Sequence, residues 1–344
     1  MHTLTGDATM KTKYYIGLDV HKENTTYAVR DRLGNIIAEG ETATLYDELQ
    51  SQLKPYLKSS QIALESSTSY YTLYQNFLKD KHDIKVANTI QLRQLISKND
   101  KLDAKRLAEM LRLGTCPASY VPEKDTQQLR SIIRLRHGIM EEKTRCNSRI
   151  QALLDRNGIV MPPHKAFTQI WKNAFNQHIG SGNIPFDIRH AYDHYRFLEN
   201  EQEQLDQEMI GFTRQHWRKE HDLLQTMPGV GPRIACYLIG EICPIKRFIN
   251  KRKLRRYAGV VPVFKESAGT KSYGKIPKAS SRELLRWALI QAANAIAKTD
   301  TRLSKYYHKK AKQKKNTAIA KVAVASSLCD IIYEVMTTQK PYPA

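Results

Sequence analysis

Between residues 14 and 113, short apolar segments alternate with amphipathic ones, and this alternation restricts the fold more than any other feature of the chain. Segments rich in β-branched and aromatic residues predict strands, whereas apolar residues that recur every three or four positions predict helices. We therefore expect strands at residues 14–20, 25–29, 36–38, 61–65 and 84–87, and helices at 45–57, 69–78 and 103–113. The order βββαβαβα predicts an α/β domain in which an antiparallel meander is extended by further strands.

After residue 126 the pattern changes to long amphipathic helices. One helix is expected at residues 126–157 and a second at 186–224, each with an apolar stripe at helical spacing. Pro162-Pro163 and Gly180-Ser181-Gly182 lie between the two helices and predict a connector that contains loops. Two such helices are typical of an arm or coiled coil through which copies of a chain associate.

The last part of the chain predicts three more apolar helices, at residues 234–242, 284–297 and 317–336. Ser280 and Ser281 precede the middle helix in a capping pattern. We therefore divide the chain into a tail (1–12), an α/β domain (13–122), a helical arm with its connector (123–222) and a mainly α C-terminal domain (223–344).

Charge is the strongest compositional signal. The chain has 55 Lys and Arg against 34 Asp and Glu, a net charge of +21. Such an excess attracts polyanions through counterion release, and we find no amphipathic anchor helix that would favour a membrane instead. Nucleic acid is the expected partner.

The same composition bears on the cellular compartment. No stretch of about 18 apolar residues occurs, and the N-terminal segment lacks the apolar core of a signal peptide, so we expect a cytoplasmic protein without a membrane partner. The five cysteines have no CxxC spacing and are expected to be reduced thiols rather than disulfides or zinc ligands.

Four carboxylates lie at strand ends or near a helix start in the α/β domain: Asp19, Glu65, Asp100 and Asp103. Strand ends and helix starts can meet at one edge of a mixed sheet, where four acids would repel one another unless hard cations lay between them. Two Mg²⁺ or Mn²⁺ ions about 3.5–4 Å apart are the usual solution, and they clamp the oxygens of an in-line phosphoryl transfer. Taken singly, each Asp is more often a turn former, and Asp103 alone reads equally well as a helix cap. The ordered set favours the metal site.

Two features of the C-terminal region suit phosphate binding. Gly229 and Gly231 precede an apolar helix as in a helix-hairpin-helix, where glycines let backbone N–H groups approach a phosphate, although tight packing alone can also require them. Residues 246–256 and 302–315 each carry seven cations and no acid, which exceeds what solubility requires. We assign the following cations to nucleic-acid contact: Lys251, Arg252, Arg255, Arg256, Lys309, Lys310 and Lys312.

Three segments make a family resemblance specific. The segments IGLDVHKENTTYAV (16–29), IALESSTSYY (62–71) and SKNDKLDAKRLAEM (97–110) resemble the acidic blocks of DEDD transposases of the insertion sequence 110 family, relatives of the Piv DNA invertases. The resemblance implies an RNase H-like (RuvC-like) domain, which is also the fold that the order βββαβαβα predicts. It implies divalent-metal binding by Asp19, Glu65, Asp100 and Asp103.

The resemblance extends into the C-terminal domain. The segments RRYAGVVP (255–262) and KES (265–267), followed by Gly274, are similar in kind and spacing to the transposase domain of the same group. This implies that Ser267 is a covalent nucleophile. Many relatives have Ser-Gly here, whereas this chain has Ser267-Ala268-Gly269, so Ser272 stays open as an alternative register.

The expected function is therefore a Mg²⁺-dependent DNA transposase or recombinase that cuts and rejoins DNA through a phosphoserine. Relatives use a structured noncoding bridge RNA to choose donor and target DNA, which implies an RNA partner here, and we expect a dimer that becomes a tetramer on DNA. The alternative is a RuvC-like junction resolvase or nuclease that hydrolyses DNA by two-metal catalysis, which would form no covalent adduct. A non-catalytic binding protein is disfavoured because all four acids are present.

Overall fold

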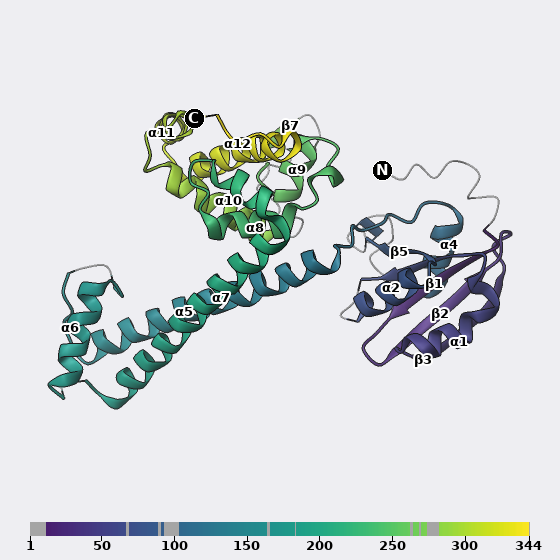
Figure 1. Cartoon of the computed structure of the whole chain (residues 1–344), viewed down its shortest axis with the longest axis horizontal. Helices are drawn as coiled ribbons and strands as arrows, with labels where there is room; N and C mark the ends of the chain where they lie inside the picture. The colour runs from purple at the N-terminus through teal and green to yellow at the C-terminus, as the bar shows by residue number, and fades with distance from the viewer. Residues whose placement is uncertain are drawn as a thin grey trace. The chain divides into compact units, whose positions relative to one another are not determined.

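A computed structural model describes residues 12–66, 69–88, 91–92, 103–163, 166–182, 184–261, 264–267, 270–273 and 282–343, with the backbone alone for 264–267 and 270–273. The chain divides into two compact units after Pro122. Each is described separately below (Figure 1).

The first unit is an α/β domain. Its elements are β1 (Tyr14–Val20), β2 (Asn24–Arg30), β3 (Ile36–Ala43), α1 (Tyr46–Leu57), β4 (Ser60–Glu65), α2 (Tyr70–Lys79), β5 (Asp83–Ala87) and α4 (Ala104–Arg112). The sheet order is β3-β2-β1-β4-β5. The pairs β1–β2 and β2–β3 are antiparallel, whereas β1–β4 and β4–β5 are parallel. The predicted meander and the mixed sheet are confirmed, as an RNase H-like domain requires.

Helices cover both faces of this sheet. On one face, Ile16 and Leu18 of β1 pack against Leu49 of α1 and Phe77 of α2. On the other face, a smaller core contains Ala63, Ala87, Leu92, Leu107 and Leu111, of which Leu107 and Leu111 belong to α4. The central strands are buried on both sides, which explains why β1 and β4 read as continuous apolar segments.

The second unit is mainly helical. Its helices are α5 (Lys124–Arg156), α6 (Gln169–Gly180), α7 (Phe186–Gln225), α8 (Pro232–Ile242), a 3₁₀ turn (Ile245–Arg247), α9 (Lys251–Ala258), α10 (Glu283–Ile296), α11 (Arg302–Lys314) and α12 (Thr317–Thr338). Strands β6 (Phe264–Ser267) and β7 (Thr270–Tyr273) form a hairpin.

Helices α5 and α7 pack along one another, with α6 at one end of the pair (Figure 1). At that end, Trp171 and Phe175 of α6 share a core with Ile150 and Tyr192. At the other end, Leu129 and Met209 belong to the same core as α8, α10 and α12. The two long helices are therefore continuous with the C-terminal core, and α7 has a kink at a non-helical residue, Trp217 (φ −138°, ψ 45°), within that region.

One local expectation is wrong, and two other segments are defined further by the structure. The connector between the long helices contains a helix, α6, in addition to loops. Helix α10 begins at Glu283 with Arg282 in the N-cap position, so the expectation that a serine caps it is wrong. The basic segments around residues 251–258 and 302–314 are themselves helices.

The cysteines are free, and four of the five are buried. Burial raises the pKa of Cys236 to about 11, so this thiol is protonated and packs as a small apolar side chain. None of the helices in the described ranges combines the length and apolar character needed to cross a bilayer.

Candidate metal centre and nucleic-acid interface

Asp19 and Glu65 lie at equivalent positions on adjacent parallel strands. The register of β1 and β4 pairs Leu18 with Leu64, and an acid follows each leucine. Neighbouring strands lie about 4.8 Å apart, and side chains at equivalent positions project from the same face. The leucines are buried in the core beneath α1 and α2, so the two acids project from the opposite face, which α4 covers.

Gly17 brings α4 onto that face. A Cβ atom at residue 17 would lie 2.0 Å from the carbonyl oxygen of Ala104 and 2.7 Å from the amide nitrogen of Ala108. Any side chain would therefore force the first turn of α4 away from β1. Because Gly17 and Asp19 project from the same face of the strand, the start of α4, with Asp103, packs on the face from which Asp19 and Glu65 project.

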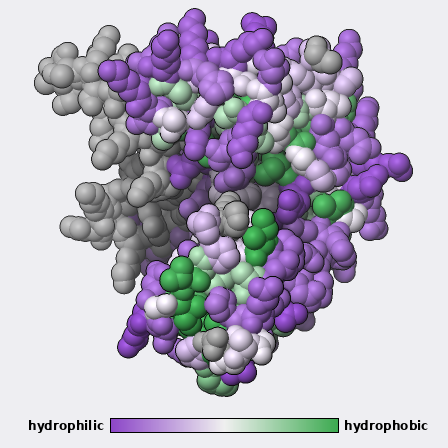
Figure 2. Space-filling view, turned by 90° about the vertical axis from the view of Figure 1, so that its left-hand side faces the viewer, coloured by the Kyte–Doolittle hydropathy of each residue, from purple (hydrophilic) through white to green (hydrophobic). Residues whose placement is uncertain are grey.

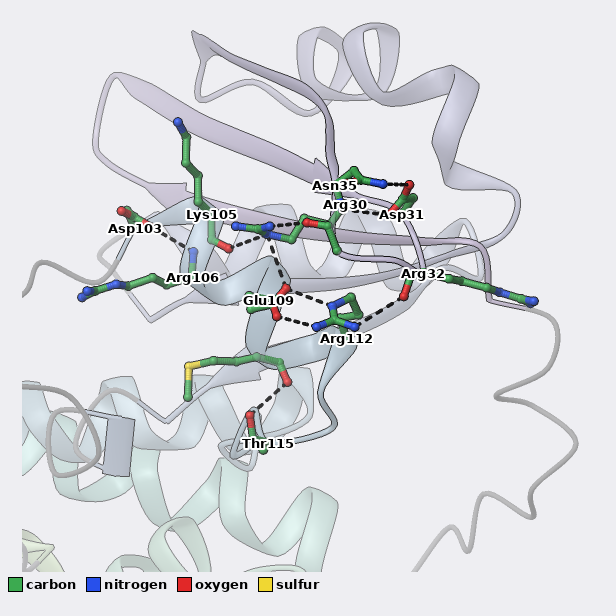
Figure 3. Close-up of polar contacts among 12 residues, drawn as sticks. Arg30, Asp31, Arg32, Asn35, Asp103, Lys105, Arg106, Glu109, Arg112 and Thr115 are labelled. Carbon is green, nitrogen blue, oxygen red and sulfur yellow. Dashed lines mark hydrogen bonds and ion pairs between the residues drawn. The ribbon is translucent and has the colours of Figure 1, made fainter.

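Asp103 caps α4. Its backbone is extended (φ −121°, ψ 168°), and its Oδ1 accepts a hydrogen bond of 2.8 Å from the amide of Arg106 (Figure 3). The capping role considered from the sequence is confirmed, and it also fixes the carboxylate at the N-terminus of the helix. At the strand end, Asp19 is half-buried, and its carboxylate lies 3.4 Å from Nε2 of the exposed His21.

An ion-pair network fixes the remainder of α4 against the β2–β3 turn (Figure 3). Glu109 accepts hydrogen bonds of 3.0 and 2.6 Å from the Arg112 guanidinium and lies 3.6 Å from that of Arg30. Arg112 in turn donates to the carbonyl of Arg32 at 3.4 Å. The hydrogen bonds from Arg112 lower the pKa of Glu109, so the network is charged at neutral pH.

Whether a metal ion would fit this site depends on the chemistry of its ligands and on how many acids lie together. Carboxylate oxygens are hard ligands that suit Mg²⁺ or Mn²⁺. Within the described ranges, no group of three or more His, Cys, Asp or Glu side chains is arranged to hold a metal ion. The fourth acid, Asp100, lies outside the described residues. The donor chemistry fits, and the four-acid centre stays a prediction.

The two candidate nucleophiles lie on opposite strands of one hairpin. Ser267 is the last residue of β6 and pairs with Thr270, whereas Ser272 lies within β7 opposite Lys265. This backbone arrangement leaves the register between the two serines open.

The two glycines of the turn before α8 have different surroundings. Gly229 has a positive φ of +75°, and a Cβ there would lie 2.5 Å from the carbonyl oxygen of Ala292 on α10. Gly229 is therefore required by backbone conformation and packing. Gly231 is the N-cap of α8, and a Cβ there would meet no atom within 4 Å, so the approach to the helix N-terminus is open at this residue.

Some of the predicted basic residues are exposed, and others contact an acid or an aromatic ring of the same unit. Lys251, Arg252 and Arg256 of α9 are exposed, whereas Arg255 lies 3.2 Å from Asp330 of α12 and so also joins two helices. On α11, Lys309 and Lys312 are exposed, and Nζ of Lys310 lies over the ring of Tyr306 at 5.7 Å. Hydrophilic side chains dominate the face in Figure 2, as the charge excess leads one to expect. The nucleic-acid contacts of the basic residues on α9 and α11 stay predictions.

Comparison with known families assigns both units. Residues 16–158 match the DEDD transposase model of IS110 elements, and residues 221–308 match the model described as the transposase IS116/IS110/IS902 family. The chain belongs to the IS110 family of DEDD transposases. It is thus a DNA transposase of the insertion-sequence type, as the acidic segments led us to expect.

Several curated transposases are similar along most of the chain. The transposase for insertion sequence element IS1328 of Yersinia enterocolitica is 21% identical over 333 residues, which are 94% of this chain and 96% of the relative. The transposase for element IS1533 of Leptospira borgpetersenii is 24% identical over 72% of this chain and 75% of its own length. The transposase for element IS1111A of Coxiella burnetii (strain RSA 493) is 22% identical over 72% of this chain and 68% of its own length. The similarity covers both units of the IS110-family chain.

Proposed function

We propose that this IS110-family transposase cuts and rejoins DNA through a covalent phosphoserine at Ser267, with divalent metal held by Asp19, Glu65, Asp100 and Asp103. The observation that supports the proposal is that Asp19 and Glu65 project from the sheet face that α4 covers, and that Asp103 lies at the start of that helix. Placement of Ser267 at the end of a hairpin strand in the matched C-terminal segment is compatible with it.

The chemistry is a pair of transesterifications. The Ser267 hydroxyl oxygen attacks a scissile phosphate, its proton leaves, and a P–O bond to one deoxyribose breaks to release a strand hydroxyl. A hydroxyl of the recombining strand then attacks the phosphoserine and frees the serine. The number of phosphodiester bonds is unchanged, so rejoining needs no external energy source.

The acids contribute by holding charge at the site. A divalent ion bound there would stabilise the negative charge that develops on the phosphoryl oxygens. Asp103 is fixed for this role by its capping bond to Arg106, and α4 is fixed by the Glu109 network. Asp19 and Glu65 are fixed by the strands that carry them.

We further propose that a noncoding guide RNA selects donor and target DNA, in line with the family resemblance. The net charge of +21 and the exposed cations of α9 and α11 are compatible with an RNA partner. They are equally compatible with DNA, for which we propose a contact at the turn before α8. Protein purified without nuclease should retain an RNA that dissociates as salt is raised. Recombination by RNA-free protein would refute guidance.

The experiment that tests the phosphoserine is a search for the covalent adduct. Purified protein with donor DNA, target DNA, its RNA and Mg²⁺ should give a DNA–protein adduct that Ser267→Ala abolishes, while Ser280→Ala serves as the matched control. Loss of the adduct only in Ser272→Ala would move the nucleophile to the other strand of the hairpin. Cleavage without any adduct would establish hydrolysis by a nuclease mechanism instead.

A further inference from the structure

A cavity in the second unit lies outside every site described so far. It is about 250 Å³ in volume and is lined by residues of α5, α8 and α10: Arg136, Met140, Arg233, Ile234, Tyr237, Trp287 and Gln291. Typical small-molecule sites measure ~300–1,000 Å³, so this cavity suits one planar ring system better than a whole cofactor.

The walls of the cavity combine flat rings with polar groups. Trp287 is half-buried, and its ring centroid lies 5.0 Å from those of both Tyr237 and His137. The hydroxyl of Tyr237 is buried beside the Arg136 guanidinium, which interacts with it. The rings of Tyr237 and Trp287 therefore supply the flat part of the wall.

An ion-pair network stiffens the wall. Asp206 of α7 accepts hydrogen bonds of 2.8 and 3.4 Å from Arg136 and of 3.1 Å from Arg233. Arg136 is buried, whereas the Arg233 side chain is 58% exposed, so Arg233 reaches solvent at the cavity. Arg233 is also two residues after Gly231, at the N-terminus of α8, where the backbone approach is open.

We infer that this cavity receives one unpaired nucleobase, with its phosphate held by Arg233 and the N-terminus of α8. A base out of its stack presents a π-face to Trp287 and a hydrogen-bonding edge to the Gln291 amide. The positive end of the helix dipole and the exposed guanidinium then favour the phosphate. A base that is paired in a duplex cannot enter the cavity, so the site would select unpaired strands. Strand exchange requires such unpaired strands.

Binding without cleavage tests this inference, which rests on the transposase assignment and not on the serine or metal chemistry. The probes are a mixed-sequence single strand and a strand of equal length with abasic sites, in Ca²⁺ or EDTA. Wild-type protein should prefer the base-bearing strand, and Trp287→Ala should weaken that strand by roughly 5- to 150-fold while leaving the abasic strand unchanged. Trp287→Phe should retain most of the preference. Phe197→Ala, which removes an exposed ring of α7 outside the cavity, should behave as wild type.

Two further measurements keep the test independent of how well Trp287→Ala folds. Photocrosslinking wild-type protein to a strand with 5-iodouracil should give adducts in α10, and Arg233→Ala should weaken base-bearing and abasic strands alike. Running deoxyribose and ribose strands in parallel identifies which nucleic acid supplies the base. Equal affinity for base-bearing and abasic strands of both kinds, or adducts only outside α5, α8 and α10, would overturn the inference.

Discussion

At the scale of single residues, Asp103 has a structural role and, in our proposal, also a chemical one. It caps α4 through its bond to the Arg106 amide, and α4 covers the sheet face from which Asp19 and Glu65 project. A capping oxygen needs no charge, whereas a metal ligand does. The two roles therefore respond differently to substitution.

Asp103→Asn should keep the cap and lose the chemistry. We expect a melting temperature close to that of the wild type and DNA cleavage reduced to background, as also expected for Glu65→Gln. Asp103→Ala should lose cleavage and, in addition, about 0.5–2 kcal/mol of stability. Thermal melting and a cleavage assay on the three proteins measure both effects. Full cleavage by Asp103→Asn would remove this residue from the metal site.

At the scale of elements, α4 is the helix that carries Asp103, one of the four proposed metal ligands. It touches the sheet through Gly17, and the Glu109 network ties it to the β2–β3 turn. A second tie joins Lys105 of α4 to Glu39 of β3 at 2.7 Å. These contacts hold the helix start that carries Asp103, so a change in them acts on the acids indirectly.

The Glu109 network should give the first unit a pH-dependent stability. The pKa of Glu109 is lowered in the folded state, so its contribution is complete above the ordinary carboxyl pKa of 4.5 and is lost as the pH falls through the lower, folded-state pKa. Glu109→Gln should therefore lower the melting temperature at pH 7, and the difference from wild type should shrink toward zero under acidic conditions. A difference that is constant with pH would show that the charge of Glu109 does not stabilise α4.

At the scale of the whole molecule, the acids and the serine belong to different compact units. The acids lie before Pro122, and Ser267 lies in the unit that follows. The long pair α5–α7 belongs to the second unit, where the apolar stripes of the two helices pack against each other, against α6 and into the C-terminal core. We propose a dimer that becomes a tetramer on DNA, with active sites composed from two subunits, as the family resemblance implies.

Mixing two inactive variants tests this arrangement. Asp103→Asn supplies an intact serine, and Ser267→Ala supplies intact acids, so a mixture should regain part of the cleavage that each protein lacks alone. Wild type mixed with either variant provides the reference for subunit exchange. If every mixture of the two variants stays inactive although subunits exchange, each site is complete within one chain.

The sequence by itself determined the features that depend on neighbours along the chain. Strand and helix positions, the ends at which Asp19 and Glu65 occur, and the capping geometry of Asp103 follow from periodicity and residue type. Family assignment followed from three short segments for the same reason. Residue order alone records these properties because each involves only a few consecutive positions.

Only the tertiary structure decided what distant segments do to one another. It brought Gly17 against Ala104, joined Arg136 to Asp206 across 70 residues, and separated the packing role of Gly229 from the open approach at Gly231. Helix α6 was missed because its few apolar residues become informative only when α5 and α7 cover them. Trp287 and Tyr237 lie in apolar helices, and nothing in their neighbouring residues indicates that they line a cavity. A cavity exists only where three helices fail to fill the space between them, and the packing of distant segments sets that space.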